Sequence, residues 1–211
     1  AALRGLPPHD HPPVFSKNTA VSCYEVRGES FRILFENDAS HLPPSLNVPP
    51  RPEVPLVHFR PIRWSQEEDF YRTARQDAWL AVHPDLLDFD GPGYLQEARE
   101  QSIWDPRAVQ LALLGAEPVG LLQLATLSGA QAGVGQVPLF WIRKDLRRKG
   151  IGVQLLGQAV SVYRGMGRTA LRLRCSPKNT PAQQFYKKYG FTKRGDVPGA
   201  QGSLDLLELS I

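Results

Sequence analysis

Apolar and polar positions follow regular periods over most of the chain, and these periods predict its strands and helices. Alternating or short apolar runs predict strands, whereas apolar positions three to four residues apart predict amphipathic helices. The predicted strands are 56–60, 109–114, 118–124, 134–142, 169–175 and 204–209. The predicted helices are 65–79, 92–102, 151–166 and 181–189, and residues 191–194 form an optional further strand.

The order of these elements, leaving out the optional strand, is β-α-α-β-β-β-α-β-α-β. Hairpins early in this order and β-α-β units late in it predict an α/β (α+β) fold, with a mixed sheet and helices on its faces. Two helix ends carry their own signals. Ser65, with Glu68 three residues later, has the form of a capping box and predicts Ser65 as the N-cap. Gly190 is expected to end the helix 181–189.

Proline separates the N-terminal part of the chain from the rest. Eleven of the 19 prolines lie at or before Pro61, and neither a helix nor a central strand is expected among them, since proline fixes φ and lacks a backbone donor. Within the N-terminal part, the runs 20–26 and 31–35 predict a β-hairpin. An isolated hairpin is barely stable, so it must pack on the main domain, on another chain or on a missing N-terminal portion. The predicted segments are a hairpin segment 1–42, a proline-rich linker 43–56 and a main domain 57–211.

Composition excludes several classes of protein. The chain is 42% hydrophobic and 22% charged, as in globular proteins with a sizeable core. No apolar run approaches the roughly 18 residues of a membrane helix, and the first residues lack a signal-peptide pattern. Cys23 and Cys175 belong to no C-x-x-C pair, so no zinc or thioredoxin-like site is predicted, and a reduced cytoplasmic location is the simplest expectation. Because the only methionine is Met166, we expect residue 1 to be a processed terminus or an interior point of a longer polypeptide.

A basic cluster between the strand 134–142 and the helix 151–166 is the first candidate for chemistry. Net charge is +4, yet five cations lie within seven positions: Arg143, Lys144, Arg147, Arg148 and Lys149. Gly150 and Gly152 let the backbone approach a ligand, and the free amides that open a helix bind phosphate oxygens. By itself, the pattern R-x-x-G-x-G fits a tight turn on a solvated basic face equally well.

A second motif, one β-α unit later, favours the interpretation of this loop as a ligand-binding site over that of a solvated turn. It has an asparagine at Asn179, an alanine at Ala182, the pair Phe185-Tyr186 and a terminal Gly190-Phe191. Together with the basic loop and the order of elements, it resembles the GNAT superfamily of N-acetyltransferases over about 57–211. The resemblance implies a GNAT-like mixed, mostly antiparallel sheet with helices on both faces, to which the N-terminal hairpin is an appendage.

The resemblance also implies a donor, acetyl-CoA, and the residues that hold it. The loop would bind the CoA pyrophosphate, the strand before it would pair with the pantetheine arm, and Asn179 would contact the cofactor. Tyr186 would protonate the departing thiolate. The cofactor-binding residues implied in this way are Phe140, Trp141, Ile142, Arg147, Arg148, Lys149, Gly150, Ile151, Gly152, Val153 and Asn179.

The acceptor implied by the resemblance is a primary amine on a small molecule or peptide, attacked directly and without a metal. A base must take the amine proton, yet residues 131–141 contain no carboxylate. Water is one candidate, and the side-chain candidates are His83, Asp85, Asp88 and Asp90. Trp64, Trp79 and Trp104 are each expected in the core, and Cys175 is expected to be a small buried residue and not a nucleophile.

The N-terminal segment carries a different resemblance. The predicted hairpin followed by Asn37-Asp38-Ala39-Ser40-His41-Leu42 is similar to the C-terminal end of histidine phosphatases of the phosphoglycerate-mutase type. The Arg-His-Gly catalytic motif of that family is absent from the chain, so no phosphatase activity is expected. The hypothesis is a fusion, in which a phosphatase remnant or a missing phosphatase domain precedes the acetyltransferase.

Two other functions compete with this interpretation. A nucleic-acid-binding module is disfavoured because aromatic residues do not interleave with the basic cluster, so neither nucleic acid nor membrane is an expected partner. A catalytically silent acyl-CoA sensor or structural domain stays open because the strand 134–142 lacks a carboxylate. The sequence leaves the acceptor, the base and the oligomeric state undetermined, and a homodimer is one option.

Overall fold

The computed structural model describes residues 21–27, 30–38, 54–128 and 133–211. The chain divides into two compact units, Ala1–Glu53 and Val54–Ile211. In the first unit, β1 (Val21–Arg27) and β2 (Ser30–Asp38) pair antiparallel, as the predicted hairpin requires. Residues 39–42, and most of the predicted linker, lie outside the described residues.

The second unit is built on one sheet. Over 54–128 and 133–211, seven strands lie in the order β3-β4-β5-β6-β7-β9-β8. Neighbouring strands are antiparallel except for β6 and β7, which confirms the predicted mixed, mostly antiparallel sheet. The strands are β3 (His58–Pro61), β4 (Val109–Leu114), β5 (Glu117–Ala125), β6 (Val134–Ile142), β7 (Ala170–Cys175), β8 (Thr192–Gly199) and β9 (Gly202–Ser210).

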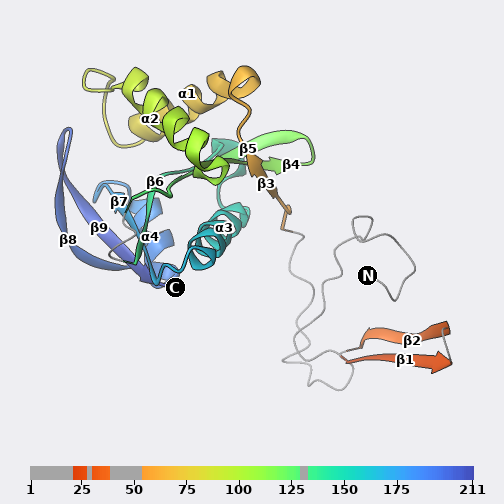
Figure 1. The fold of residues 1–211 in the computed structure, drawn as a ribbon. Helices are drawn as coiled ribbons and strands as arrows, with labels where there is room; N and C mark the ends of the chain where they lie inside the picture. The colour runs from red at the N-terminus through yellow and green to blue at the C-terminus, as the bar shows by residue number, and fades with distance from the viewer. Residues whose placement is uncertain (1–20, 28–29, 39–53, 129–132) are drawn as a thin grey trace. The chain divides into compact units, whose positions relative to one another are not determined.

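Helices cover both faces of this sheet (Figure 1). Leu111 and Leu121 pack with α1 and α2 on one face, whereas Ala112 and Leu122, their neighbours in sequence, pack with α3 on the other. This alternation follows from the period of two in a strand. The helices are α1 (Trp64–Leu80), α2 (Gly91–Trp104), α3 (Ile151–Gly165) and α4 (Thr180–Lys188), with short 3₁₀ turns η2 (Pro106–Ala108) and η4 (Lys144–Leu146). None of the helices described is long and apolar enough to span a membrane.

The start of α1 differs from the prediction. The helix begins at Trp64 with Arg63 as its N-cap, so the assignment of Ser65 as N-cap is wrong. The Glu67 carboxylate accepts a hydrogen bond from the Arg63 backbone N–H at 2.7 Å and also pairs with Arg60. Glu68 instead pairs with Arg72 and Arg99. Only the glutamate half of a capping box is therefore present, because the Arg63 side chain makes no capping hydrogen bond, and it uses the glutamate before the one that the sequence pattern selected.

The C-terminal end of the sheet is longer than predicted. The optional strand 191–194 is β8, which pairs with β9 along its length. Its first three residues are exposed, and half-buried and exposed residues alternate only from Gly195 on; the strand also contains Pro198. These features suit an edge strand, where proline is tolerated, but they give no apolar signal. Gly190 ends α4 with φ +87°, as predicted, and its N–H donates to the Lys187 carbonyl.

The parallel strands β6 and β7 pair over only the first part of their length. Their register covers only Val134–Val137 against Ala170–Leu173. At this point β6 also has a β-bulge against β5. Gln123 pairs with Leu139 and Ala125 pairs with Gln136, so two residue positions along β5 match three along β6. Pro138 lies in the bulge, a position that suits a residue with no N–H. Beyond it, β6 runs on beside β5 to Ile142 and leaves its other edge without β7.

Candidate functional site

A cleft of about 1140 Å³ opens where β6 and β7 part. One side is formed by β6 from Gln136 to Phe140 and by the end of β7 with the turn that follows it. The other contributions come from the C-terminal half of α1, the start of α2, α4 and the β8–β9 turn. Three of the predicted site residues meet in this cleft: Phe140, Asn179 and Tyr186.

Tyr186 is buried on α4, with 7% of its surface exposed, and its ring lies edge-on to Phe140 and Phe191. Burial raises the pKa of the phenol well above its ordinary value, so the hydroxyl keeps its proton at neutral pH. Asn179 is the N-cap of α4, and its Oδ1 accepts from the Ala182 N–H at 3.3 Å. Its amide nitrogen is thus the remaining donor of this side chain at the cleft.

Cys175, at the end of β7, also lines the cleft. Burial, with the nearby Asp205 carboxylate, raises the pKa of its thiol to about 12. A thiol in this state is not a thiolate at neutral pH, and only the thiolate is a strong nucleophile. The prediction of a small buried residue is confirmed.

The loop after β6 enters α3 through a left-handed turn. Arg148 has φ +64° and Gly150, the N-cap of α3, has φ +83°. The first amides of a helix have no acceptor within it, so those of α3 remain available at this end. A Cβ on Gly150 would lie 2.5 Å from Val54, and one on Gly152 would lie 3.0 Å from Phe185, so both glycines allow close packing within the protein.

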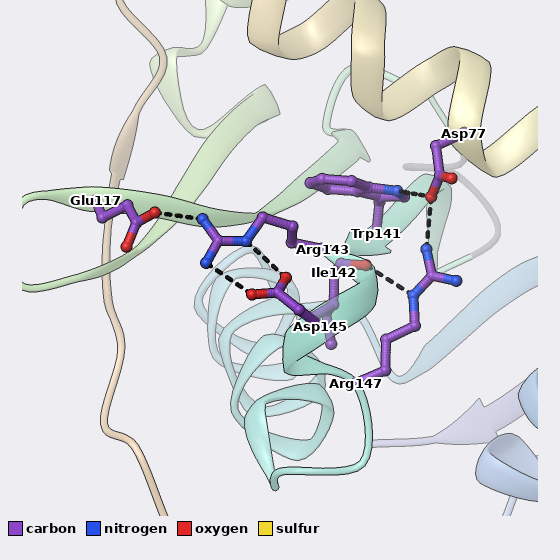
Figure 2. A network of polar contacts seen from close by, with 7 residues as sticks. All are labelled: Asp77, Glu117, Trp141, Ile142, Arg143, Asp145 and Arg147. Carbon is purple, nitrogen blue, oxygen red and sulfur yellow. Dashed lines mark hydrogen bonds and ion pairs between the residues drawn. The ribbon is translucent and has the colours of Figure 1, made fainter.

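Most of the basic cluster is paired with carboxylates (Figure 2). Arg147 donates from Nη2 to Asp77 Oδ2 at 2.6 Å and from Nε to the Ile142 carbonyl at 2.8 Å. Lys144 pairs with Asp77 Oδ1 at 2.9 Å, and Arg143 lies between Glu117 and Asp145. Arg148 and Lys149 are exposed and form no ion pair with the described residues. Only these two cations of the cluster therefore face solvent unpaired within the described part of the chain.

Asp77 joins α1 to β6 and to the loop. Besides Arg147 and Lys144, its Oδ2 accepts from Trp141 Nε1 at 2.7 Å (Figure 2). Burial alone would raise the pKa of this carboxyl, but the three donors outweigh it and hold the pKa below its ordinary value. Trp141 therefore points into the core toward α1, where Phe70 lies edge-on to it at 5.6 Å, and its side chain does not line the cleft.

Of the four base candidates, only His83 lines the cleft. Its Nδ1 lies 3.0 Å from the Trp79 carbonyl oxygen, and its ring stacks on the Trp79 indole with centroids 3.8 Å apart. The three aspartates serve local structure instead. Asp85 accepts from the Leu87 N–H, Asp90 caps α2 through the Gly93 N–H, and Asp88 accepts from Gln201.

The three tryptophans have different environments. Trp64 packs against the core, as predicted, but Trp79 lines the cleft and Trp104 is 78% exposed, so the core prediction is wrong for both. Arg75, Phe89 and Tyr94 also line the cleft, although none of them was predicted from the sequence. The one available signal was the spacing of four that places residues 75, 79 and 83 on one helical face.

No three His, Cys, Asp or Glu side chains among the described residues lie close enough to hold a metal ion.

The chain matches a family model described as the acetyltransferase (GNAT) family over residues 61–191. No curated protein sequence matches it. The match does not reach the N-terminal segment, and the resemblance to histidine phosphatases gains no support from any comparison and stays a prediction.

Solved structures share the fold. Ard1 from Thermoplasma volcanium is 20% identical, with a TM-score of 0.59, and the match covers 74% of this chain and 97% of that one. Arabidopsis thaliana Naa50, solved with a bisubstrate analogue CoA-Ac-MVNAL, is 16% identical with a TM-score of 0.54, over 74% and 99% of the chains. PaiA N-acetyltransferase from Thermoplasma acidophilum, solved with coenzyme A, is 15% identical with a TM-score of 0.52, over 74% and 99%. At these identities the likeness establishes the fold.

The Asp77 network gives a test of stability. Asp77→Asn keeps an oxygen for Trp141 but removes the charge that pairs with Lys144 and Arg147. We expect the free energy of unfolding at pH 7 to fall by about 1–2 kcal/mol. Because the folded-state pKa lies below the ordinary 3.8, the contribution of the carboxylate is complete above that value and is lost as the pH falls through the folded-state pKa.

Urea denaturation at a series of pH values measures the difference in the free energy of unfolding between the wild type and Asp77→Asn. It should stay constant near neutrality and vanish in acid. Asp69→Asn, at an exposed position of the same helix, is the matched control and should change little. A difference between wild type and Asp77→Asn that persists undiminished in acid would contradict the assignment.

Proposed function

The chain belongs to the acetyltransferase (GNAT) family, and from that premise we propose that it transfers an acetyl group from acetyl-CoA to a primary amine by direct attack. One observation carries the proposal. After Val137, the edge of β6 that is no longer paired with β7 lies beside a cleft, and the basic loop that follows β6 leads to an open helix N-terminus. An extended thioester with a diphosphate at its far end has the shape and charge that such an arrangement accommodates.

The free edge of β6 is the proposed site of the pantetheine arm. Backbone groups of Phe140 to Ile142 would pair with its amides as a further strand would. The first turn of α3, around Ile151 to Val153, would hold the pyrophosphate, assisted by the exposed Arg148 and Lys149. Arg147 is already bonded to Asp77, so we assign it to holding the loop in place. Asn179 would donate its amide nitrogen to the cofactor.

Tyr186 is the proposed acid. A neutral amine attacks the thioester carbonyl, the C–N bond forms, the C–S bond breaks, and the thiolate takes the phenolic proton. Burial keeps that proton on Tyr186 until negative charge appears on sulfur. The same burial makes a thiolate in the cleft more basic, since desolvation disfavours both anions.

His83 is the proposed base. The Trp79 carbonyl can only accept a hydrogen bond, so in the neutral imidazole Nδ1 carries the hydrogen and Nε2 has the lone pair. That nitrogen would take the proton that the amine loses. Glu97, on α2, is the one carboxylate among the described residues that line the cleft, and it serves as the comparison.

A second candidate function is an acyl-CoA-binding domain without turnover. The specific observation in its favour is that β6 carries no carboxylate. The two functions share the donor site and differ only in turnover. Binding of acetyl-CoA without the release of CoA, with every amine of a broad panel, would favour the silent domain.

The donor site is tested by Lys149→Glu. Charge reversal beside the first turn of α3 should raise the Kd of acetyl-CoA about tenfold at low salt, because it opposes the diphosphate. The effect should shrink as the ionic strength rises. Calorimetric titration measures it, and Arg164→Glu, which reverses an exposed charge in the last turn of α3, is the control. Equal affinities for the wild type and Lys149→Glu would argue against this location.

Removing only the hydroxyl tests Tyr186. In Tyr186→Phe the ring still packs on Phe140, so acetyl-CoA affinity should stay within about twofold while kcat falls by about 10²-fold. Tyr189→Phe removes the same group from the C-cap residue of α4, outside the cleft, and should leave kcat unaltered. Steady-state kinetics alongside calorimetry separate the two parameters. A kcat equal to that of the wild type would remove Tyr186 from the mechanism.

His83→Ala tests the base. The variant should lose about 10²-fold in kcat/KM, and added imidazole should restore part of the rate, because it replaces the missing proton acceptor. Glu97→Gln should lose much less. The assignment fails if Glu97→Gln shows the larger loss, or if imidazole restores no activity to His83→Ala.

A further inference from the structure

Four aromatic side chains form a continuous row along the cleft. They are Trp79 from the last turn of α1, His83 and Phe89 from the segment between α1 and α2, and Tyr94 from α2, and together we call them the aromatic wall. Ring centroids are 3.8 Å apart for Trp79 and His83, 5.6 Å for Trp79 and Phe89, and 5.7 Å for Phe89 and Tyr94. Each ring thus touches the next.

The wall is separate from the hydrophobic core. None of its four residues belongs to a core cluster of the described part of the chain, and each is only half-buried. Apolar rings are costly to leave facing a cleft unless something packs on them, because their burial is worth several kcal/mol in a core. Their placement therefore favours a ligand as the missing partner.

The wall is also held rigidly at the point where the strands part. Arg75 lies over the Tyr94 ring at 4.3 Å and donates to the Pro138 carbonyl at 3.2 Å, which joins the wall to the bulge in β6. Trp79 Nε1 donates to the Asp85 carbonyl at 2.7 Å, which fixes the indole. Fixed rings lose little entropy when a ligand binds.

The β8–β9 turn lines the same cleft. Gln201 in this turn donates to Asp88 at 3.0 Å, so the turn is tied to the loop that carries Phe89. The turn residues at the cleft are uncharged: Pro198, Gly199, Ala200, Gln201, Gly202, Ser203 and Leu204. The aromatic wall and an uncharged turn thus belong to one cleft.

Charge limits the class of amine further. Glu97 is the only carboxylate among the described residues that line the cleft, whereas Arg75, Arg174 and Lys178 bring positive charge. A polyamine or a lysine-rich peptide needs several carboxylates for its cations. This lining provides one, so it disfavours such acceptors.

We propose that the acceptor is a small primary amine that carries an aromatic ring, and that this ring packs on the aromatic wall while the amine is acetylated. The inference rests on the proposed function and names the substrate class of its site. Trp79 is the specificity-determining residue, because it contacts both His83 and Phe89.

The test compares three amines with the full-length chain at saturating acetyl-CoA: phenethylamine, n-butylamine and spermidine. We expect kcat/KM for phenethylamine to exceed that of the other two by about tenfold or more, the gain from burying an aromatic ring. Trp79→Ala should bring the ratio of phenethylamine to n-butylamine close to one. Trp79→Phe should restore much of it, and Trp104→Ala, an exposed tryptophan outside the cleft, should leave it unchanged.

The outcomes separate this inference from the proposed function. A higher kcat/KM for spermidine, or a ratio that survives in Trp79→Ala, overturns the inference and leaves the enzyme intact. If acetyl-CoA binds but no amine reacts, calorimetric titration of the CoA-loaded protein with phenethylamine tests whether the aromatic amine binds. If phenethylamine binds and Trp79→Ala abolishes that binding, the result supports the aromatic wall as a binding surface and contradicts the proposed acetyl transfer. If phenethylamine does not bind, the inference is overturned. Failure to bind acetyl-CoA contradicts the proposed function itself.

Discussion

The early parting of β6 from β7 is the constraint on which the rest of the domain depends. Backbone N–H and C=O groups along a strand need partners, and β6 loses β7 as a partner after Val137. Pro138, in a bulge at that point, has no N–H to offer, and its carbonyl accepts from Arg75. The strand then continues beside β5 alone. A cleft with an unpaired strand edge follows from this geometry, and it suits an extended ligand that carries its own amides.

Helix α1 connects the bulge beside the cleft to the basic loop. Arg75 fixes it to the bulge, and Asp77 fixes it to Trp141 and to the basic loop. The next residues of the same helix include Trp79, which supports His83. The loop proposed for the donor and the wall proposed for the acceptor are thus positioned by side chains from one stretch of helix. This explains why so much of the basic cluster is engaged within the protein.

Sequence patterns predicted the central strands, α3 and α4, because these depend on periodicity, whereas the resemblance to a family implied that Phe140, Asn179 and Tyr186 share one site. These patterns gave incomplete or wrong predictions where contacts between residues distant in the sequence determine the structure. Edge strand β8 lacks an apolar period, and the cap of α1 depends on which glutamate reaches back to Arg63. Trp79 and Trp104 look alike in sequence, yet one lines a cleft and the other faces solvent. The ion pair of Arg147 with Asp77 joins residues 70 positions apart, a distance over which local patterns carry no information.

Backbone hydrogen exchange with and without acetyl-CoA tests the central claim most directly. If the free edge of β6 pairs with the donor and the first turn of α3 holds its diphosphate, amides of 139–142 and 148–153 should exchange more slowly when acetyl-CoA is added. Amides of β4, which is paired on both sides, should not change. Unaltered exchange in both segments at saturating acetyl-CoA would contradict the account.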